Sequence, residues 1–137
     1  MTDRSENRFI DSIDEYAMLA AEDATYHGFG QGTTGALMYS ALGLTAKAGE
    51  VAENVSKLYR DYEALPQIKA ELVEQAREEL GNIFWYAVRL IDELNSYGFS
   101  NERRLPSDIL SENLDKMAPR KARNALVGSG VSDEGVF

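Results

Sequence analysis

The stretch LGLTAKAGEVAENVSKLYRD (Leu42–Asp61) decides the fold class. Its apolar residues recur every three or four positions, as they do along one face of an amphipathic helix. The period continues on both sides and predicts a helix over about Ala36–Tyr62. Gly43 and Gly49 interrupt this helix, each at a cost of ~1 kcal/mol relative to alanine. We therefore expect another helix to pack close to the backbone at these glycines.

The rest of the chain also follows the helical period. We expect a first helix over about Asn7–Ala21, a third from Pro66 to about Asn95 and a fourth with Ser107 as its N-cap. Asp108 is placed favourably against the dipole of the fourth helix, and we expect Pro119 to end it. From about residue 118 the sequence reads as a tail that is basic, then glycine-rich, then acidic.

These patterns predict one all-α domain over residues 1–137, a four-helix bundle. The apolar positions expected in the core of the third and fourth helices are Ile68, Leu72, Ala76, Leu80, Ile83, Phe84, Ala87, Val88, Ile91, Ile109, Leu110, Leu114 and Met117. Apolar residues such as Phe84, Trp85 and Leu90 spread around the third helix. This distribution favours burial on more than one side, and hence self-association.

Composition excludes several classes of function. The chain of 137 residues has no cysteine and one histidine, His27, so thiolate chemistry and histidine-rich metal sites are excluded. His27 lies in a glycine-rich stretch, where we expect a loop or surface position. The net charge of −9 repels nucleic-acid polymers. No apolar run reaches the ~20 residues that span a bilayer, and the polar start is no signal peptide, so we expect a cytoplasmic protein away from membranes.

Two pairs of polar residues on the predicted helices have metal-ligand chemistry. Glu50 and Glu53 share one helix face, as do Glu79 and Asn82, with Glu78 beside them. If the second and third helices pack antiparallel, these oxygens could converge on Mg²⁺ or Mn²⁺. The alternative is that the glutamates are solvated surface residues, as most glutamates are. Neighbouring glycines and aromatic residues are more typical of a cleft than of an open helix face.

The segments LGLTAKAGEVAENVSKLYRD and EELGNIFWYAVRL (Glu78–Leu90) resemble the MazG-like branch of the all-α nucleoside triphosphate pyrophosphohydrolases. That family has a GLxGExGEVAE-type segment and an EELGDxxWY-type segment, which together form an ExxE…ExxD site. The resemblance extends upstream through DEYAMLAAEDATY and downstream through NLDKMAPRKARNALVGSG. It covers the chain from about Asp14 to Gly130.

The resemblance implies a homodimer or a tetramer that cleaves a nucleoside triphosphate, with Mg²⁺ (or Mn²⁺), into a monophosphate and pyrophosphate. It implies catalytic and metal-binding roles for Glu50, Glu53 and Glu79, with Asn82 and Glu78 as further ligands. A basic patch would hold the phosphates, and aromatic residues are candidates for stacking on the base. The patch comprises Lys116, Arg120, Lys121 and Arg123, and the stacking candidates are Trp85 and Tyr86, with Tyr16 and Tyr26 as further candidates.

The sequence departs from the family pattern at two ligand positions and in the tail. Lys47 stands at the first acidic position and Asn82 at the ExxD aspartate, and the tail reads GSGVSDE where GSGDNR is frequent. An ammonium cannot ligate a metal while protonated. Three interpretations follow: a working hydrolase, with Glu50, Glu53, Glu78 and Glu79 still holding metal; a nucleotide-binding sensor or sequestering protein in which Lys47 contacts phosphate; or a helical interaction module in which Lys47 turns outward and pairs with a glutamate.

Overall fold

The computed structural model describes residues 9–60, 63, 65–99 and 102–127. It consists of four helices: α1 (Ile13–Glu22), α2 (Thr34–Arg60), α3 (Pro66–Ser96) and α4 (Pro106–Val127). The prediction of an all-α fold with four helices is confirmed. Within the described part of the chain, no helix is long and apolar enough to cross a membrane.

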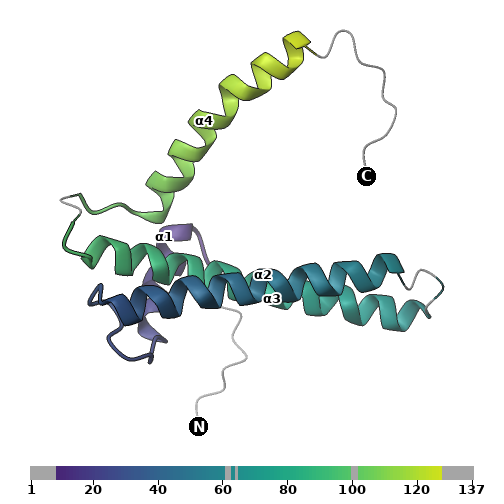
Figure 1. Cartoon of the computed structure of the whole chain (residues 1–137), viewed down its shortest axis with the longest axis horizontal. Coiled ribbons are helices and arrows are strands. Elements are labelled where there is room, and N and C mark those ends of the chain that lie inside the picture. Colours follow the sequence, from purple (N-terminus) through teal and green to yellow (C-terminus); the bar gives the residue numbers. More distant parts are fainter. Residues whose placement is uncertain (1–8, 61–62, 64, 100–101, 128–137) are drawn as a thin grey trace.

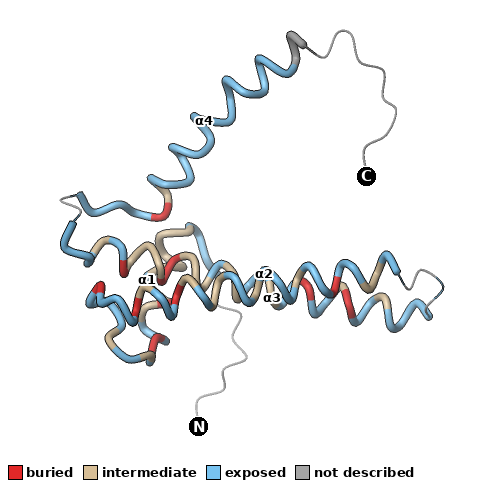
Figure 2. Tube along the Cα trace, in the orientation of Figure 1, coloured by how far each residue is buried: buried red, intermediate tan, exposed pale blue. Residues whose placement is uncertain are grey.

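The two long helices, α2 and α3, form an antiparallel hairpin, and α1 packs across α3 near one end of it (Figure 1). Buried positions lie where the three helices meet and also further along the α2–α3 hairpin (Figure 2). The buried apolar side chains are few and mostly small. They are Ala20, Ala24, Ala36, Leu72, Ala76 and Val88. The core of a single chain is therefore thin, and much apolar surface stays exposed.

Side-chain caps define where α1 and α2 begin. Ser12 accepts a hydrogen bond from the Glu15 N–H (3.1 Å), and the Glu15 carboxylate accepts one from the Asp11 N–H (2.8 Å). This arrangement is a variant of the capping box in which the glutamate accepts from the residue before the N-cap, and it starts α1 at Ile13. The prediction that the first helix begins near Asn7 is therefore wrong over residues 9–12; residues 7 and 8 lie outside the described residues. Thr33 caps α2 by accepting from the Ala36 N–H.

The start of α4 also differs from the prediction by one or two residues. Pro106 is the first helical residue, so Leu105, and not Ser107, stands at the N-cap position. Asp108 accepts a hydrogen bond from the Leu105 N–H at 2.9 Å, which confirms its favourable place in the first turn. Ser107 instead bonds to Asp14 of α1 through both its N–H (2.9 Å) and its hydroxyl (2.5 Å).

The prediction that Pro119 ends the fourth helix is wrong, because α4 continues to Val127. A proline inside a helix removes one hydrogen bond and crowds the carbonyl four residues earlier. Both costs are smaller on an exposed helix, where water can solvate the freed carbonyl of Asp115. The expected basic tail is thus helical up to residue 127, and its glycine-rich end lies outside the described residues.

Beyond its first turn, α4 stands clear of the α2–α3 hairpin (Figure 1), and every residue from 108 to 124 is exposed. The predicted apolar face of α4 is therefore not buried within the chain. Ile68, Leu80 and Phe84 of α3 are also exposed, contrary to the predicted core, whereas Leu72, Ala76 and Val88 are buried as predicted. The exposed positions of α3 are those that a fourth packed helix would cover.

The expectation that another helix packs close to the backbone at both glycines of α2 is confirmed at Gly43 and wrong at Gly49. A Cβ added at Gly43 would overlap the ring of Tyr86, so this glycine allows α3 to approach closely. A Cβ added at Gly49 would meet nothing within 4 Å. Gly49 therefore lies on an open part of the helix surface.

Candidate functional site

Lys47 lies between carboxylates from both long helices. Its Nζ is 3.0 Å from Glu50 Oε2, one turn further along α2, and 3.2 Å from Glu79 Oε2 on α3. The amide of Asn82 donates a hydrogen bond to the same Glu79 oxygen at 3.0 Å. The side chains of Lys47 and Glu79 are only 26% and 19% exposed, so both are partly buried where α2 meets α3. Four of the sequence-predicted residues are thus brought together.

The contacts within this cluster favour the charged forms of Lys47 and Glu79. Hydrogen bonds to Glu50 and then Glu79 raise the pKa of Lys47 above its ordinary value of 10.5. The hydrogen bond from Asn82, followed by contacts with Glu50 and Lys47, lowers the pKa of Glu79 below its ordinary value of 4.5. The groove therefore contains one cation shared by two carboxylates at neutral pH.

The other two predicted acidic ligands lie differently. Glu53 is exposed and pairs with Lys57 at 2.8 Å, and this contact lowers the pKa of the Glu53 carboxyl. Glu78 is exposed on α3. Over the described ranges, no group of three or more histidine, aspartate or glutamate side chains is gathered at metal-binding spacing.

Whether the residues fit a divalent ion depends on Lys47. Two carboxylates that already meet within 3.2 Å of one Nζ atom supply the usual protein share of a Mg²⁺ site, because this ion keeps waters and takes phosphate oxygens. The Asn82 carbonyl oxygen is a further neutral donor. The ammonium occupies the same position, so the donors fit the ion only once the flexible lysine side chain has moved.

An aromatic cluster lies one to two helical turns from this ionic cluster. The rings of Tyr26 and Tyr39 stack at 4.6 Å, and Tyr86 lies 5.8 Å from Tyr39 and 5.1 Å from Trp85. Tyr86 follows Asn82 by one turn of α3, so aromatic and charged groups share one groove. The two predicted stacking residues are therefore in contact with each other. Sequence analysis missed Tyr39, whose only signal is its place two turns before Lys47.

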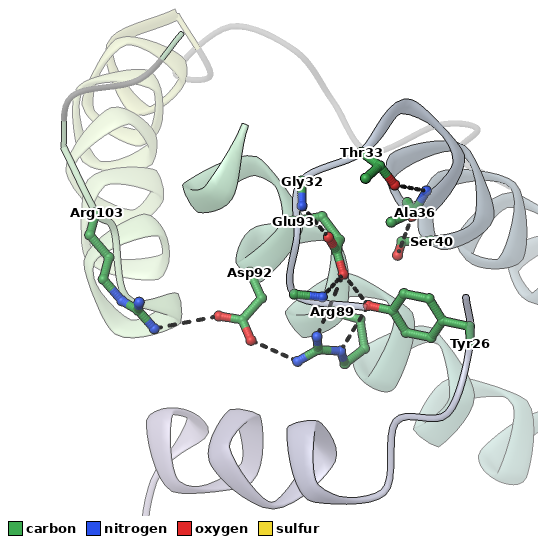
Figure 3. A network of polar contacts seen from close by, with 10 residues as sticks. Tyr26, Gly32, Thr33, Ala36, Ser40, Arg89, Asp92, Glu93 and Arg103 are labelled. Atoms are coloured by element: carbon green, nitrogen blue, oxygen red, sulfur yellow. Dashed lines mark hydrogen bonds and ion pairs between the residues drawn. The ribbon is translucent and has the colours of Figure 1, made fainter. Parts of the chain in front are cut away.

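A buried polar network fixes the loop that precedes α2 (Figure 3). Glu93 is 0% exposed and accepts hydrogen bonds from the N–H groups of Gly30 (2.6 Å) and Gly32 (2.8 Å) and from the Tyr26 hydroxyl. Arg89, 1% exposed, donates to Tyr26 at 3.1 Å and pairs with Asp92 at 2.7 Å. Burial and then the bond to Glu93 raise the pKa of Tyr26, so the phenol stays a donor.

This network holds one ring of the aromatic cluster in place, because Tyr26 belongs to both. Sequence analysis did not single out Arg89 or Glu93. Their four-residue spacing is that of an ordinary surface ion pair. Only the loop folded over Arg89 and Glu93 distinguishes this buried pair from a pair on an open helix face. His27 is exposed in the same loop, as expected.

The predicted phosphate patch is not brought to the ionic cluster within one chain. Lys116, Arg120, Lys121 and Arg123 are exposed on the part of α4 that stands away from the hairpin (Figure 1). Lys121 and Arg120 border a shallow groove with Leu114 and Met117. At 100° per residue, Lys116, Arg120 and Arg123 share one side of α4, and Lys121 projects about 100° away from Arg120.

A cavity of about 450 Å³ lies on the other side of α3, between Gly81, Phe84 and the residues around the start of α1. Its lining is largely apolar and contains none of the predicted metal or phosphate residues. The charged groove between α2 and α3 is chemically the better candidate, because phosphates and cations need the groups that this cavity lacks.

Comparison with known proteins gives one match. The chain is 32% identical over 119 residues to the Gene 37 protein of Mycobacterium phage L5, covering 86% of this chain and 96% of that protein. The chain belongs to the Gene 37 protein family. No family model matches the chain, and no solved structure matches it. The name of the Gene 37 protein states no activity, so membership of the Gene 37 family leaves the function to be argued from the site.

Proposed function

We propose that the protein is a nucleoside triphosphate pyrophosphohydrolase of the MazG-like type, with its site in the groove between α2 and α3. The observation that supports this most directly is the meeting of Glu50 and Glu79, from two different helices, at a single cation. Carboxylates that converge in this way repel each other unless a cation lies between them. The two side chains would therefore accept a cation between them, and here that cation is the Lys47 ammonium.

In this proposal the triphosphate brings a divalent ion with it and Lys47 exchanges partners. Mg²⁺ between Glu50 and Glu79 would neutralise phosphate charge and lower the pKa of a bound water. Lys47, freed from the carboxylates, would pair with a phosphate oxygen, since its long side chain can swing by several ångströms. Asn82 would keep Glu79 oriented through its hydrogen bond.

The chemical step is attack of water on the α-phosphorus. A bond forms between the water oxygen and that phosphorus, and the bond to the oxygen bridging the α- and β-phosphates breaks, releasing pyrophosphate. We assign Glu50 as the acceptor of the water proton, because its side chain is 47% exposed and therefore open to water. The aromatic cluster of Tyr26, Tyr39, Trp85 and Tyr86 would place the base by stacking.

The geometry of Lys47 also supports a second candidate, a protein that binds nucleotides and turns them over poorly. An ammonium already bridging both carboxylates competes with a metal for the same oxygens. If Lys47 stays there and receives phosphate from the open side, the nucleotide is held without the ion that the chemistry needs. The third candidate, a helical interaction module, predicts no nucleotide binding at all.

One set of measurements separates these candidates. Purified protein is incubated with each of the common ribo- and deoxyribonucleoside triphosphates and Mg²⁺ or Mn²⁺, and pyrophosphate release is followed. We expect release with at least one nucleotide, and its loss in the Glu50→Gln and Glu79→Gln variants. Absence of release with every nucleotide would exclude the hydrolase. Calorimetric titration of nucleotide with and without metal then separates the second candidate, which binds without metal, from the third.

A double substitution tests the assignment of Lys47 and Asn82. Lys47→Glu with Asn82→Asp restores the acidic residues of the family pattern and removes the competing ammonium. We expect pyrophosphate release to rise by at least ~10-fold, since each 1.4 kcal/mol of transition-state stabilisation gives that factor. The exposed pair Glu74→Arg with Arg77→Glu on α3 serves as a control that exchanges charges away from the ligand positions. An unchanged rate in the first variant would show that the ligand positions are assigned wrongly.

A further inference from the structure

The Lys47 ammonium lies at the point where a divalent ion shared by Glu50 and Glu79 would have to lie. Lys47 Nζ is 3.0 Å from Glu50 Oε2 and 3.2 Å from Glu79 Oε2, and these two oxygens come from different helices. Glu79 Oε2 also accepts a hydrogen bond from the Asn82 amide at 3.0 Å, which keeps this oxygen turned toward the lysine. An ion bound by both carboxylates needs the same oxygens. Lys47 and the ion therefore exclude each other from this position.

A free divalent ion gains little by displacing Lys47. Mg²⁺ gives up its hydration waters reluctantly, and the ammonium loses both of its carboxylate partners in the exchange. The displaced ammonium also stays close, because Lys47 is fixed to α2 one turn before Glu50. The side chains of Lys47 and Glu79 are only 26% and 19% exposed, so water screens the repulsion between the two cations only in part. The carboxylates thus have a competitor for the ion within their own chain.

A polyphosphate removes both obstacles at the same time. Its oxygens give the displaced ammonium a new anionic partner, which the flexible four-carbon stem of a lysine can reach. They also complete the coordination of the ion, because Mg²⁺ is usually held by one or two carboxylates together with substrate phosphates. Binding of the ion and binding of the polyphosphate are then linked, and each raises the affinity for the other by the same factor.

We propose that Lys47 closes the Glu50–Glu79 pair to free divalent ions, and that the pair opens only when a polyphosphate binds together with the ion. The groove then recognises the metal–polyphosphate complex as a unit, and the nucleobase is not needed to open it. As regards the polyphosphate, this inference rests on the proposed function and describes the regulation of the same site. The exclusion of free ions by Lys47 does not depend on that function.

Binding of free Mn²⁺ tests the exclusion without any activity. The paramagnetic resonance signal of unbound Mn²⁺ is followed while the ion is titrated into wild-type protein and into the Lys47→Met variant. Methionine is unbranched and flexible like lysine, and it has neither a charge nor an oxygen donor. We expect Lys47→Met to bind Mn²⁺ at least ~10-fold more tightly than wild type, a factor within the usual range of coupling between two sites. Lys47→Arg, which keeps the charge, should resemble wild type.

Two further variants make this test specific. Arg77→Met removes a cation from the exposed pair with Glu74 on α3, so it changes the net charge equally and should bind Mn²⁺ as wild type does. Lys47→Met combined with Glu79→Gln should lose the gain, because one of the two carboxylates is gone. Circular dichroism shows that each variant is folded. Equal Mn²⁺ affinity of wild type and Lys47→Met would overturn the proposal, as would a gain that survives Glu79→Gln.

Inorganic tripolyphosphate tests the opening, because it has the phosphate groups of the proposed substrate and no base. Equilibrium dialysis measures how tightly wild type and Lys47→Met bind the complex of Mn²⁺ with tripolyphosphate, which forms equally in both solutions. We expect wild type to bind this complex at least as tightly as the variant, since Lys47 then contacts phosphate. An advantage of Lys47→Met that persists at ~10-fold in the presence of tripolyphosphate would show that the polyphosphate does not open the pair.

The failure of this inference can be distinguished from the failure of the proposed function. Exclusion of free Mn²⁺ by Lys47 and joint binding of Mn²⁺ with tripolyphosphate, but no pyrophosphate release from any nucleotide, would reject the hydrolase and leave the inference intact. Pyrophosphate release by wild type, together with equal affinity of wild type and Lys47→Met for free Mn²⁺, would reject the inference alone.

Discussion

Lys47 is the residue on which the proposed function depends. The sequence places it near Glu50 on one helix, but an i,i+3 pair of this kind also forms freely in solvent. The contact that matters is with Glu79, which belongs to another helix. Residue types and spacing could therefore predict the members of the cluster, although not that the ammonium lies between the carboxylates. Glu53, with the same spacing from Glu50, turns to Lys57 instead.

The ionic cluster predicts how stability varies with pH. The pKa of Glu79 is lowered by folding, so its contribution is present above pH 4.5 and is lost as the pH falls through its folded pKa. The pKa of Lys47 is raised, so its contribution is present below pH 10.5 and is lost as the pH rises through its folded pKa. We expect the melting temperature, followed by circular dichroism, to be flat between these limits and to fall outside them.

The Glu79→Gln variant is the control for this pH dependence. It removes the shifted carboxyl and weakens the attraction for Lys47, so the difference in melting temperature between wild type and variant should shrink at both extremes of pH. A difference that stays constant from acid to alkali would contradict the assignment.

At the scale of elements, the helices could be predicted because each follows one apolar period. Predicted and observed bounds of α2 and α3 agree within about two residues. The wrong predictions arise from what surrounds each residue in the fold. Pro119 lies in an exposed helix that tolerates it, and Phe84 and Leu80, predicted in the core, are not covered by a fourth helix. Periodicity shows that a face is apolar without showing what packs on it.

The two glycines of α2 should respond oppositely to alanine. Gly43→Ala places a methyl group in the Tyr86 ring and forces the aromatic cluster to shift, which costs about 1–3 kcal/mol and exceeds the helix propensity gained. Gly49→Ala meets open space and should stabilise by about 0.5–1 kcal/mol. Urea unfolding measures both. Equal effects of the two substitutions would show that Tyr86 does not press on α2.

At the scale of the whole molecule, the link between the start of α2 and the end of α3 depends on Glu93. The sequence could not predict this, because a charged pair at helical spacing is typical of a solvated face. Burial follows from the loop of positive-φ glycines at residues 28, 30 and 32, which turns two N–H groups toward the carboxylate. A Cβ at Gly32 would collide with the backbone of Ser96 and Tyr97, so only glycine allows this approach.

Replacing Glu93 should therefore be costly. Glu93→Gln keeps the shape but removes the buried one of the two charge partners of Arg89 and puts an amide donor toward one of the glycine N–H groups, for which we expect a loss of about 3–5 kcal/mol. Asp92→Asn is the matched control: Asp92 also pairs with Arg89 but is 31% exposed, and its loss should cost about 1 kcal/mol or less. Chemical denaturation compares the two, and similar losses would mean that Glu93 is not the central acceptor.

The long sequence separation between the glycine loop and Glu93 has a consequence for the order of folding. The α2–α3 hairpin forms through contacts between neighbouring segments, which are reached quickly. The bonds from Gly30 and Gly32 to Glu93 close a loop of more than 60 residues and must also strip water from a charged group. We therefore expect the hairpin to form first and the amino-terminal third to dock last. Amide protons of α1 and its loop should then exchange through partial openings that leave the hairpin intact.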